Sequence, residues 1–299
     1  MDEEMVFEMS ASSLDDLPSV GEMFDLTGKV AVVSGTIGLA LNVIYRLASC
    51  GAKVVFGARR EAIGQMVEER LREMGFDVRF CKLDVTSVES CREIVDFAEQ
   101  TYGTVDIVVP VAAAFFARAF VDVKESEYDR IVDTDQKGQY FLVQAAARSM
   151  IRGGHGGKVV TIASVAYRGE DMPKLAMMTA YNTAKAGVVG MTRGIAKELK
   201  QYGINVNCVV PGGMITPGAI FNNATTAALY GPEWMRCVEA NGSVVPVATN
   251  PDEVARMILT LCTPMSDFMY GQTVEVDGGS QFSFQDKPWS YTMEGGLHA

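Results

Sequence analysis

A tyrosine and a lysine four residues apart, Tyr181 and Lys185, are the pair in this sequence best suited to acid–base chemistry. On a helix this spacing places both side chains on one face, one turn apart. A nearby ammonium group favours the phenolate, so it lowers a tyrosine pKa that starts near ~10. Such a tyrosine can exchange a proton with an alcohol oxygen near neutral pH. Because the same spacing is common on solvated helices by chance, other features must support this interpretation.

The composition argues against several other kinds of site. Only two histidines are present, His155 and His298, so a histidine-based metal site or a Ser-His-Asp triad is not expected, and we predict no metal. The six cysteines are scattered without a C-x-x-C motif, which is typical of reduced thiols in a cytoplasmic protein. A net charge of −11 without a basic run argues against nucleic-acid binding. No apolar stretch approaches the ~20 residues of a membrane span, and Met1–Ser10 lacks the order of a signal peptide.

Strand-like and helix-like segments alternate along the chain. Short apolar runs predict strands at 29–33, 54–56, 78–83, 105–109, 158–162, 205–210 and 272–276. Amphipathic spacing predicts a helix ending near Ala48 and helices at 60–74, 88–102, 128–151, 181–201 and 251–261. This order requires right-handed crossovers and a parallel sheet covered on both faces. The sequence therefore predicts an α/β fold: a three-layer, doubly wound Rossmann-type sheet in a single domain.

The two ends of the chain differ from this central pattern. Residues 1–23 are polar and acidic, and we expect an arm that is either loose or packed on a partner subunit. Residues 24–280 form the predicted catalytic domain. The tail 281–299 carries Phe284, Trp289 and Tyr291, and we expect it to cover a neighbouring subunit's site or to close its own.

Two features indicate a dinucleotide site. Gly35 and Gly38 lie in the turn between the first strand and its helix, where backbone N–H groups can approach a pyrophosphate. The second strand ends at Ala58 instead of a carboxylate, and Arg59 and Arg60 follow. Arginines at this point favour the 2′-phosphate of NADP(H), although NAD(H) is also a candidate. The alternatives are an ordinary strand–helix turn and a solvated start to the next helix.

From Phe24 to Ser280 the chain resembles the short-chain dehydrogenase/reductase family. The similarity is carried, in order, by Leu26–Ala31, Leu83–Thr86, Val159–Ser164, Tyr181–Ala186, Ile195–Leu199, Asn205–Gly212 and Val276–Gly279. The resemblance implies that Tyr181 is the general acid/base, that Lys185 lowers its pKa and binds the ribose, and that Ser164 hydrogen-bonds the substrate oxygen. It implies a homodimer or homotetramer built on the long helices. The cofactor contacts it implies are Gly35, Thr36, Ile37, Gly38, Leu39, Asp84, Val85, Ala112, Pro211, Gly212, Met214 and Thr216, besides the arginines, Tyr181 and Lys185.

The sequence departs from the family pattern at four places. The glycine loop is one residue shorter and has Ala40 at its last glycine position, where a methyl group is expected to crowd or shift the loop. The segment Pro110–Ala113 replaces a pair of asparagines after the fourth strand. Asp135 stands at the fourth catalytic position, where the family has an asparagine whose carbonyl helps to hold a relay water. Extra residues through 168–173 separate Ser164 from Tyr181.

The expected activity is the interconversion of a secondary alcohol and a ketone by hydride transfer. Flexible and aromatic residues near the expected substrate site suit a bulky apolar ligand such as a steroid, namely Met172, Leu175, Met177, Met178, Ile220, Phe221, Leu229, Tyr230 and Trp234. The same residues could equally be core or interface residues. The alternatives are an acyl-carrier-protein ketoreductase, a regulatory binding protein on the same scaffold, and a structural subunit of an active homologue.

Overall fold

The computed structural model describes residues 16–169, 177–219 and 248–279, together with residues 2, 5–7, 14, 228, 290–292 and 296–298. Several sequence predictions lie outside this range: the predicted substrate residues between 170 and 176 and between 220 and 227, those at 229–230 and 234, and most of the C-terminal tail.

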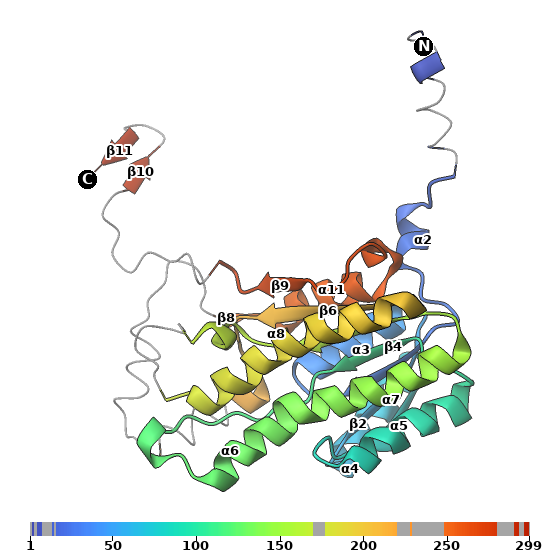
Figure 1. The fold of residues 1–299 in the computed structure, drawn as a ribbon. Helices are drawn as coiled ribbons and strands as arrows, with labels where there is room; N and C mark the ends of the chain where they lie inside the picture. Colours follow the sequence, from blue (N-terminus) through green and yellow to red (C-terminus); the bar gives the residue numbers. More distant parts are fainter. Residues whose placement is uncertain are drawn as a thin grey trace.

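A parallel sheet of seven strands forms the centre of the molecule (Figure 1). Its order is β3–β2–β1–β4–β5–β6–β9, so the order reverses between β1 and β4. The strands are Val-rich and largely buried, as expected of a sheet with both faces covered. Their bounds are β1 Val30–Ser34, β2 Lys53–Ala58, β3 Val78–Lys82, β4 Ile107–Pro110, β5 Gly157–Ile162, β6 Ile204–Pro211 and β9 Thr273–Val276. All seven predicted strands are confirmed, with small shifts at their ends.

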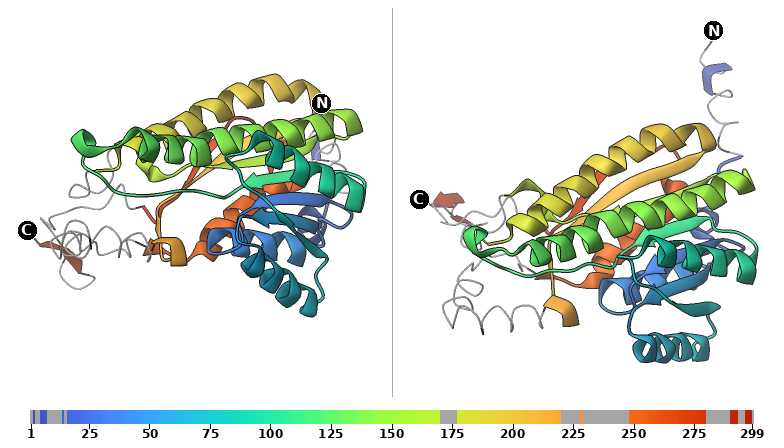
Figure 2. Two further views of the ribbon diagram at one scale, coloured as in Figure 1. Left: turned by 90° about the horizontal axis from the view of Figure 1, so that it is seen from below. Right: turned by 60° about the horizontal axis from the view of Figure 1, so that its bottom comes forward.

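Helices cover both faces of the sheet in two layers (Figure 2). One buried cluster packs residues of α3, α4 and α11 against the sheet, and a second packs those of α5, α7 and α8. Their bounds are α3 Leu39–Ser49, α4 Glu61–Glu73, α5 Val88–Tyr102, α7 Gly138–Gly153, α8 Thr179–Leu199 and α11 Pro251–Cys262. The predicted three-layer, single-domain fold is therefore confirmed. Within the described ranges, no helix has the length and apolar character needed to cross a membrane.

The helix predicted at 128–151 differs from the observed one in its start and its form. Helical structure begins with α6 at Glu125–Val132, passes through a π-helical turn at Asp133–Lys137 and continues as α7. In this turn the amide of Gly138 donates to the carbonyl of Asp133, five residues earlier. Gly138 is close to the chain beyond β3, because an added Cβ would lie 2.8 Å from the carbonyl oxygen of Val85. The π-turn thus lies against the chain segment that follows β3.

The remaining elements are short. A one-turn helix, α2 (Val20–Phe24), spans the boundary between the predicted arm and the domain and begins with a capping box in which Ser19 and Glu22 exchange hydrogen bonds. Further single turns and short strands in the described ranges are η2 Phe120–Asp122, η4 Val165–Arg168, η5 Lys200–Tyr202, η6 Pro264–Ser266, β7 Gly213–Met214, β8 Ala248–Thr249, β10 Ser290–Thr292 and β11 Gly296–His298. Strands β7 and β8 pair with each other, as do β10 and β11 within the predicted tail.

Candidate active site

The glycine turn after β1 has the backbone that a dinucleotide requires. Gly35 has φ +110° and Gly38 has φ +62°, values that favour glycine. Gly38 is the N-cap of α3 and provides no capping side chain, so first-turn N–H groups of this eleven-residue helix remain for a ligand. Thr36 is buried in the turn, Ile37 is exposed, and Leu39 begins the helix. These residues fit a pyrophosphate group at the helix N-terminus.

The alanine at the last glycine position is accommodated in this turn. Ala40 is buried, and its Cβ lies 2.7 Å from the place where a Cβ on Gly35 would be. The methyl group therefore occupies space that Gly35 leaves open. The turn accommodates the methyl group because Gly35 has no side chain.

Three chain segments meet at this turn, at the point where the strand order reverses. The hydroxyl of Ser34 accepts a hydrogen bond of 3.0 Å from the amide of Ala112, which joins the ends of β1 and β4. Thr216 approaches from beyond β7, with its Cβ 3.2 Å from the position of a Cβ on Gly38. Ligands of open parallel sheets bind at this reversal. The structure thus brings together Gly35, Gly38, Ala112 and Thr216.

The other predicted contacts flank this crevice. Arg59 and Arg60 are exposed at the start of α4, and Ala58 pairs in register with Lys82. The carboxylate of Asp84 fixes the turn after β3, where one oxygen accepts from the amide and hydroxyl of Thr86. Pro211 is the buried last residue of β6; beyond it, the amide of Gly212 donates to the carbonyl of Val276 at 3.1 Å, and Met214 packs on the core.

Helix α8 holds the tyrosine and lysine as the sequence predicted. The ammonium of Lys185 lies 5.4 Å from the centroid of the Tyr181 ring. Lys185 is 1% exposed, whereas Tyr181 is half-buried. Burial alone would lower the pKa of Lys185, but the charges of Asp135 and Tyr181 hold it above its ordinary value. The lysine therefore stays charged next to the phenol.

Ser164 follows the end of β5, the strand whose last carbonyl also contacts Lys185. Its hydroxyl accepts a hydrogen bond of 3.2 Å from the amide of Ala166 and caps the turn η4. The side chain is partly exposed. The segment that separates it from α8 includes residues outside the described ranges, so the predicted longer spacing stays a prediction.

A buried carboxylate completes the surroundings of Lys185. Asp135 has no exposed surface, and its Oδ2 lies 3.2 Å from the lysine Nζ. Its Oδ1 accepts a hydrogen bond of 2.6 Å from the amide of Ala114, beyond β4. Lys185 also donates to the carbonyl of Ile162 at 3.1 Å. Three elements, the π-turn, β5 and α8, therefore meet at the ammonium.

Known proteins are similar to this chain over most of its length. The sequence family described as "Enoyl-(Acyl carrier protein) reductase" matches residues 33–281. The chain is 33% identical over 271 residues to a sorbitol dehydrogenase of Cereibacter sphaeroides, covering 86% of this chain and 99% of the relative. It is 30% identical over 259 residues to (+)-borneol dehydrogenase 2 of Salvia officinalis, covering 85% and 89%. The chain belongs to the short-chain dehydrogenase/reductase family.

Solved structures agree with this assignment. An actinorhodin polyketide ketoreductase, crystallised with NADPH, has a TM-score of 0.76 and 28% identity, over 84% of this chain and 97% of that one. This short-chain dehydrogenase/reductase is thus a nicotinamide-dependent oxidoreductase acting on CH–OH groups. The relatives differ widely in the substrates for which they are named, so the family leaves the substrate open.

Two residues of the site were not found from the sequence. Gln139 of α7 bonds both backbone groups of Ile162 and also the carbonyl of Asp135, so it fixes β5 against the π-turn. Phe115 lies edge-on to Tyr181, with the ring centroids 5.2 Å apart. Neither residue belongs to a motif in the sequence, and each acts across elements that meet only in the fold.

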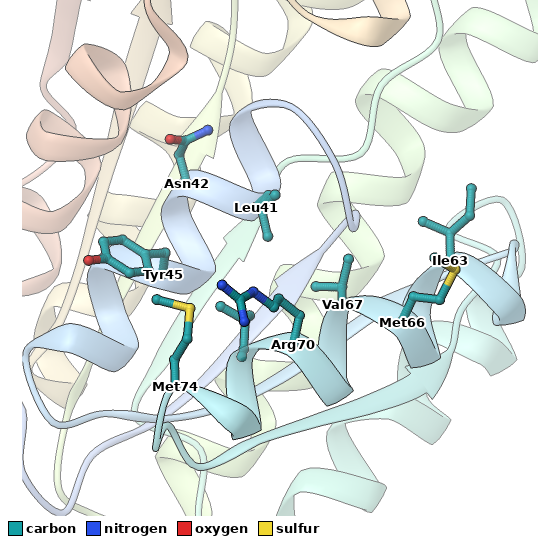
Figure 3. Close-up of a pocket in the computed structure, with 9 residues that line it drawn as sticks. Leu41, Asn42, Tyr45, Ile63, Met66, Val67, Arg70 and Met74 are labelled. Carbon is teal, nitrogen blue, oxygen red and sulfur yellow. The ribbon is translucent and has the colours of Figure 1, made fainter.

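A separate apolar pocket lies between α3 and α4 (Figure 3). It has a volume of about 550 Å³ and is lined mainly by apolar side chains, including Leu41, Tyr45, Met66 and Met74. Arg70 is its charged residue. Since it contains none of the predicted acid–base residues, we place the catalytic site at α8 and not here.

Proposed function

We propose that this short-chain dehydrogenase/reductase interconverts a secondary alcohol and a ketone on a bulky apolar substrate, a steroid or another polycyclic alcohol, with NADP(H). The observation that carries the substrate class is the aromatic wall beside the reactive phenol: Phe115 stacks edge-on against Tyr181 at 5.2 Å. Phe116 packs with Tyr181 against Ile131, Ala180 and Ala184. Such a wall favours apolar carbon skeletons over polyols, whose hydroxyls need polar partners.

In the proposed reaction, Tyr181 gives or takes the proton of the reacting oxygen. The bound nicotinamide supplies or accepts the hydride. The hydroxyl of Ser164 hydrogen-bonds the oxygen as charge develops on it. The ammonium of Lys185 favours the phenolate form of Tyr181 by charge. Lys185 would also hold the ribose of the cofactor when it is bound.

A substrate panel tests this proposal. Initial rates are measured with NADP⁺ for matched secondary alcohols: a steroid alcohol, a bicyclic terpenoid alcohol and sorbitol. We expect kcat/KM to be at least tenfold higher for the apolar alcohols. A preference for sorbitol would contradict the substrate class but leave the oxidoreductase assignment intact.

An acyl-carrier-protein substrate is a second candidate, supported by the description of the matching family. Such a carrier is acidic and needs cationic residues at the entrance. Arg118, which lies in the same loop after β4 as Phe115, is paired with Glu127, so its charge is already offset. Reduction of a 3-oxoacyl thioester at a rate above that of a polycyclic ketone would favour this candidate.

We also propose a homodimer or homotetramer in a reducing, cytoplasmic setting. Large apolar or aromatic side chains are exposed on the long helices, among them Tyr128, Tyr140 and Ile151. The five cysteines in the described ranges are free thiols. Exposed apolar surface on long helices supports association of like chains.

A further inference from the structure

The fourth position of the active site carries a charge here, because the sequence has an aspartate where the family has an asparagine. Asp135 is fully buried, in the π-turn between α6 and α7. A buried carboxylate without a countercharge is strongly unfavourable. The partner of Asp135 is Lys185, whose Nζ is 3.2 Å from Oδ2.

Both carboxylate oxygens face hydrogen-bond donors, so the geometry favours the ionised form. Oδ1 accepts from the Ala114 amide at 2.6 Å, and Oδ2 faces the ammonium. Within the described ranges, Oδ2 receives no well-directed hydrogen bond. The negative charge of Asp135 is therefore balanced by the positive charge of the Lys185 ammonium. Burial raises the pKa of Asp135, while Lys185 and the Ala114 amide oppose that rise.

The same ammonium is the group that favours the phenolate of Tyr181. Its nitrogen lies 5.4 Å from the tyrosine ring centroid, on the same helix. An adjacent negative charge weakens the field of the ammonium at the ring. Tyr181 therefore faces an ion pair, where a neutral residue at position 135 would leave it facing an isolated cation.

We propose that Asp135 is a positioning residue that tunes Tyr181 through Lys185. Its carboxylate holds the ammonium against β5 and offsets the positive charge at the phenol, so that Tyr181 ionises at a higher pH than the lysine alone would set. This inference rests on the proposed role of Tyr181 as general acid/base.

Few other groups in the described ranges can produce such an effect. The titratable groups that act on Lys185 are Asp135, Tyr181 and the thiol of Cys208 on β6. Burial raises the pKa of that thiol, so it carries no charge near neutral pH. Asp133, in the same turn, pairs with Lys137 at the surface, at 2.9 Å. Asp133 is therefore a matched control: it has the same chemistry and the same turn, but it does not contact Lys185.

The test is a spectroscopic titration of Tyr181 in the unliganded protein. The variants are Asp135→Asn, Asp135→Ser and the control Asp133→Asn. The absorbance of tyrosinate is followed with pH, and each protein is compared with its own Tyr181→Phe partner to isolate one tyrosine among ten. Circular dichroism across the same pH range confirms that each variant is folded. Serine is included because its hydroxyl can accept the hydrogen bond from the Ala114 amide. Unlike asparagine, it has no side-chain amide N–H that could point at the Lys185 ammonium.

We expect both charge-neutral variants to lower the midpoint of Tyr181 by about one pH unit, the lower end of the effect of a nearby charge. The control is expected to leave the midpoint unchanged. The acid limb of the kcat/KM profile for alcohol oxidation is expected to shift by the same amount.

Several outcomes would overturn the proposal. These are an unchanged midpoint in folded Asp135→Asn and Asp135→Ser, or an equal shift in Asp133→Asn. Failure of both Asp135 variants to fold would assign the carboxylate to fold stability alone. If the midpoint shifts as expected but the wild-type protein turns over no alcohol or ketone, the proposed function fails while the tuning role stands.

Discussion

The phenol of Tyr181 is the single group on which the proposed chemistry depends. Replacing it with phenylalanine keeps the ring that stacks on Phe115 and removes the exchangeable proton. We expect Tyr181→Phe to lower kcat by roughly 10²–10⁴-fold, the usual contribution of a general acid/base. The cofactor dissociation constant, measured by fluorescence titration, should change little. Wild-type turnover in this variant would exclude Tyr181 as the acid/base.

The arginines at the start of α4 are the residues on which the NADP(H) preference is based. Both Arg59 and Arg60 are exposed, and the strand before them ends in Ala58 without a carboxylate. We expect the double variant Arg59→Ala, Arg60→Ala to weaken NADPH binding at least tenfold. NADH binding should stay within about twofold because NADH lacks the 2′-phosphate. Equal losses for the two cofactors would indicate a general defect in the site.

At the scale of elements, an ion pair joins α3 to α11 on one side of the sheet. Arg46 and Asp252 form two hydrogen bonds of 2.6 Å each. These bonds and the guanidinium charge lower the pKa of Asp252 below 3.8. The ionised Asp252 therefore contributes its full stabilisation at pH values above the ordinary pKa of an aspartate. This stabilisation is lost as the pH falls through the lowered pKa of Asp252 in the folded state.

The corresponding prediction concerns Asp252→Asn. Near pH 7 we expect a loss of about 1 kcal/mol in the free energy of unfolding, measured with urea, because the pair is partly exposed. The difference from wild type should disappear at a pH below the lowered pKa of Asp252. Glu73→Gln, which breaks the exposed pair with Arg70, is the control and should cost almost nothing. A loss that persists at low pH would point to packing instead of charge.

Most helices and strands could be predicted from the sequence, because a strong hydrophobic periodicity specifies a helix or a strand regardless of what packs against it. The helix predicted at 88–102 has those bounds in the structure, with Ser87 as its cap and Gly103 as its end. The π-turn could not be predicted, because the residues Asp133–Lys137 have no apolar pattern that indicates the extra residue of a π-helical turn.

The sequence indicates the candidate residues that belong to motifs, but it does not indicate the contacts between residues that are far apart in the chain. Tyr181 and Lys185 share a helix, so their proximity follows from their spacing. Asp135 and Lys185 are far apart in the chain, and nothing local indicates that they form a buried ion pair. The edge-on contact of Phe115 with Tyr181 likewise joins the loop after β4 to α8, two segments that are far apart in the chain.

At the scale of the whole molecule, we expect association through the long helices. Tyr140, on α7, is 42% exposed. In a twofold interface each substitution occurs twice, so a charge there is strongly disruptive. We expect Tyr140→Arg to lower the sedimentation coefficient from the value of a dimer or tetramer to that of a monomer. Met66→Arg, on the exposed side of α4, is the control and should leave the assembly intact. A monomeric wild-type protein would contradict the proposal.

The complementary fit of Gly35 and Ala40 also restricts the mutational routes open to this protein. The methyl of Ala40 occupies the space that any side chain at position 35 would need. The effect of a substitution at either site therefore depends on the residue at the other, which is epistasis within a single turn. A library that varies position 40 toward larger residues, or position 35 toward any side chain, would recover few folded clones. Varying both codons together would relieve the clash but not the strain at position 35, because Gly35 has φ +110°, a value that disfavours every other residue.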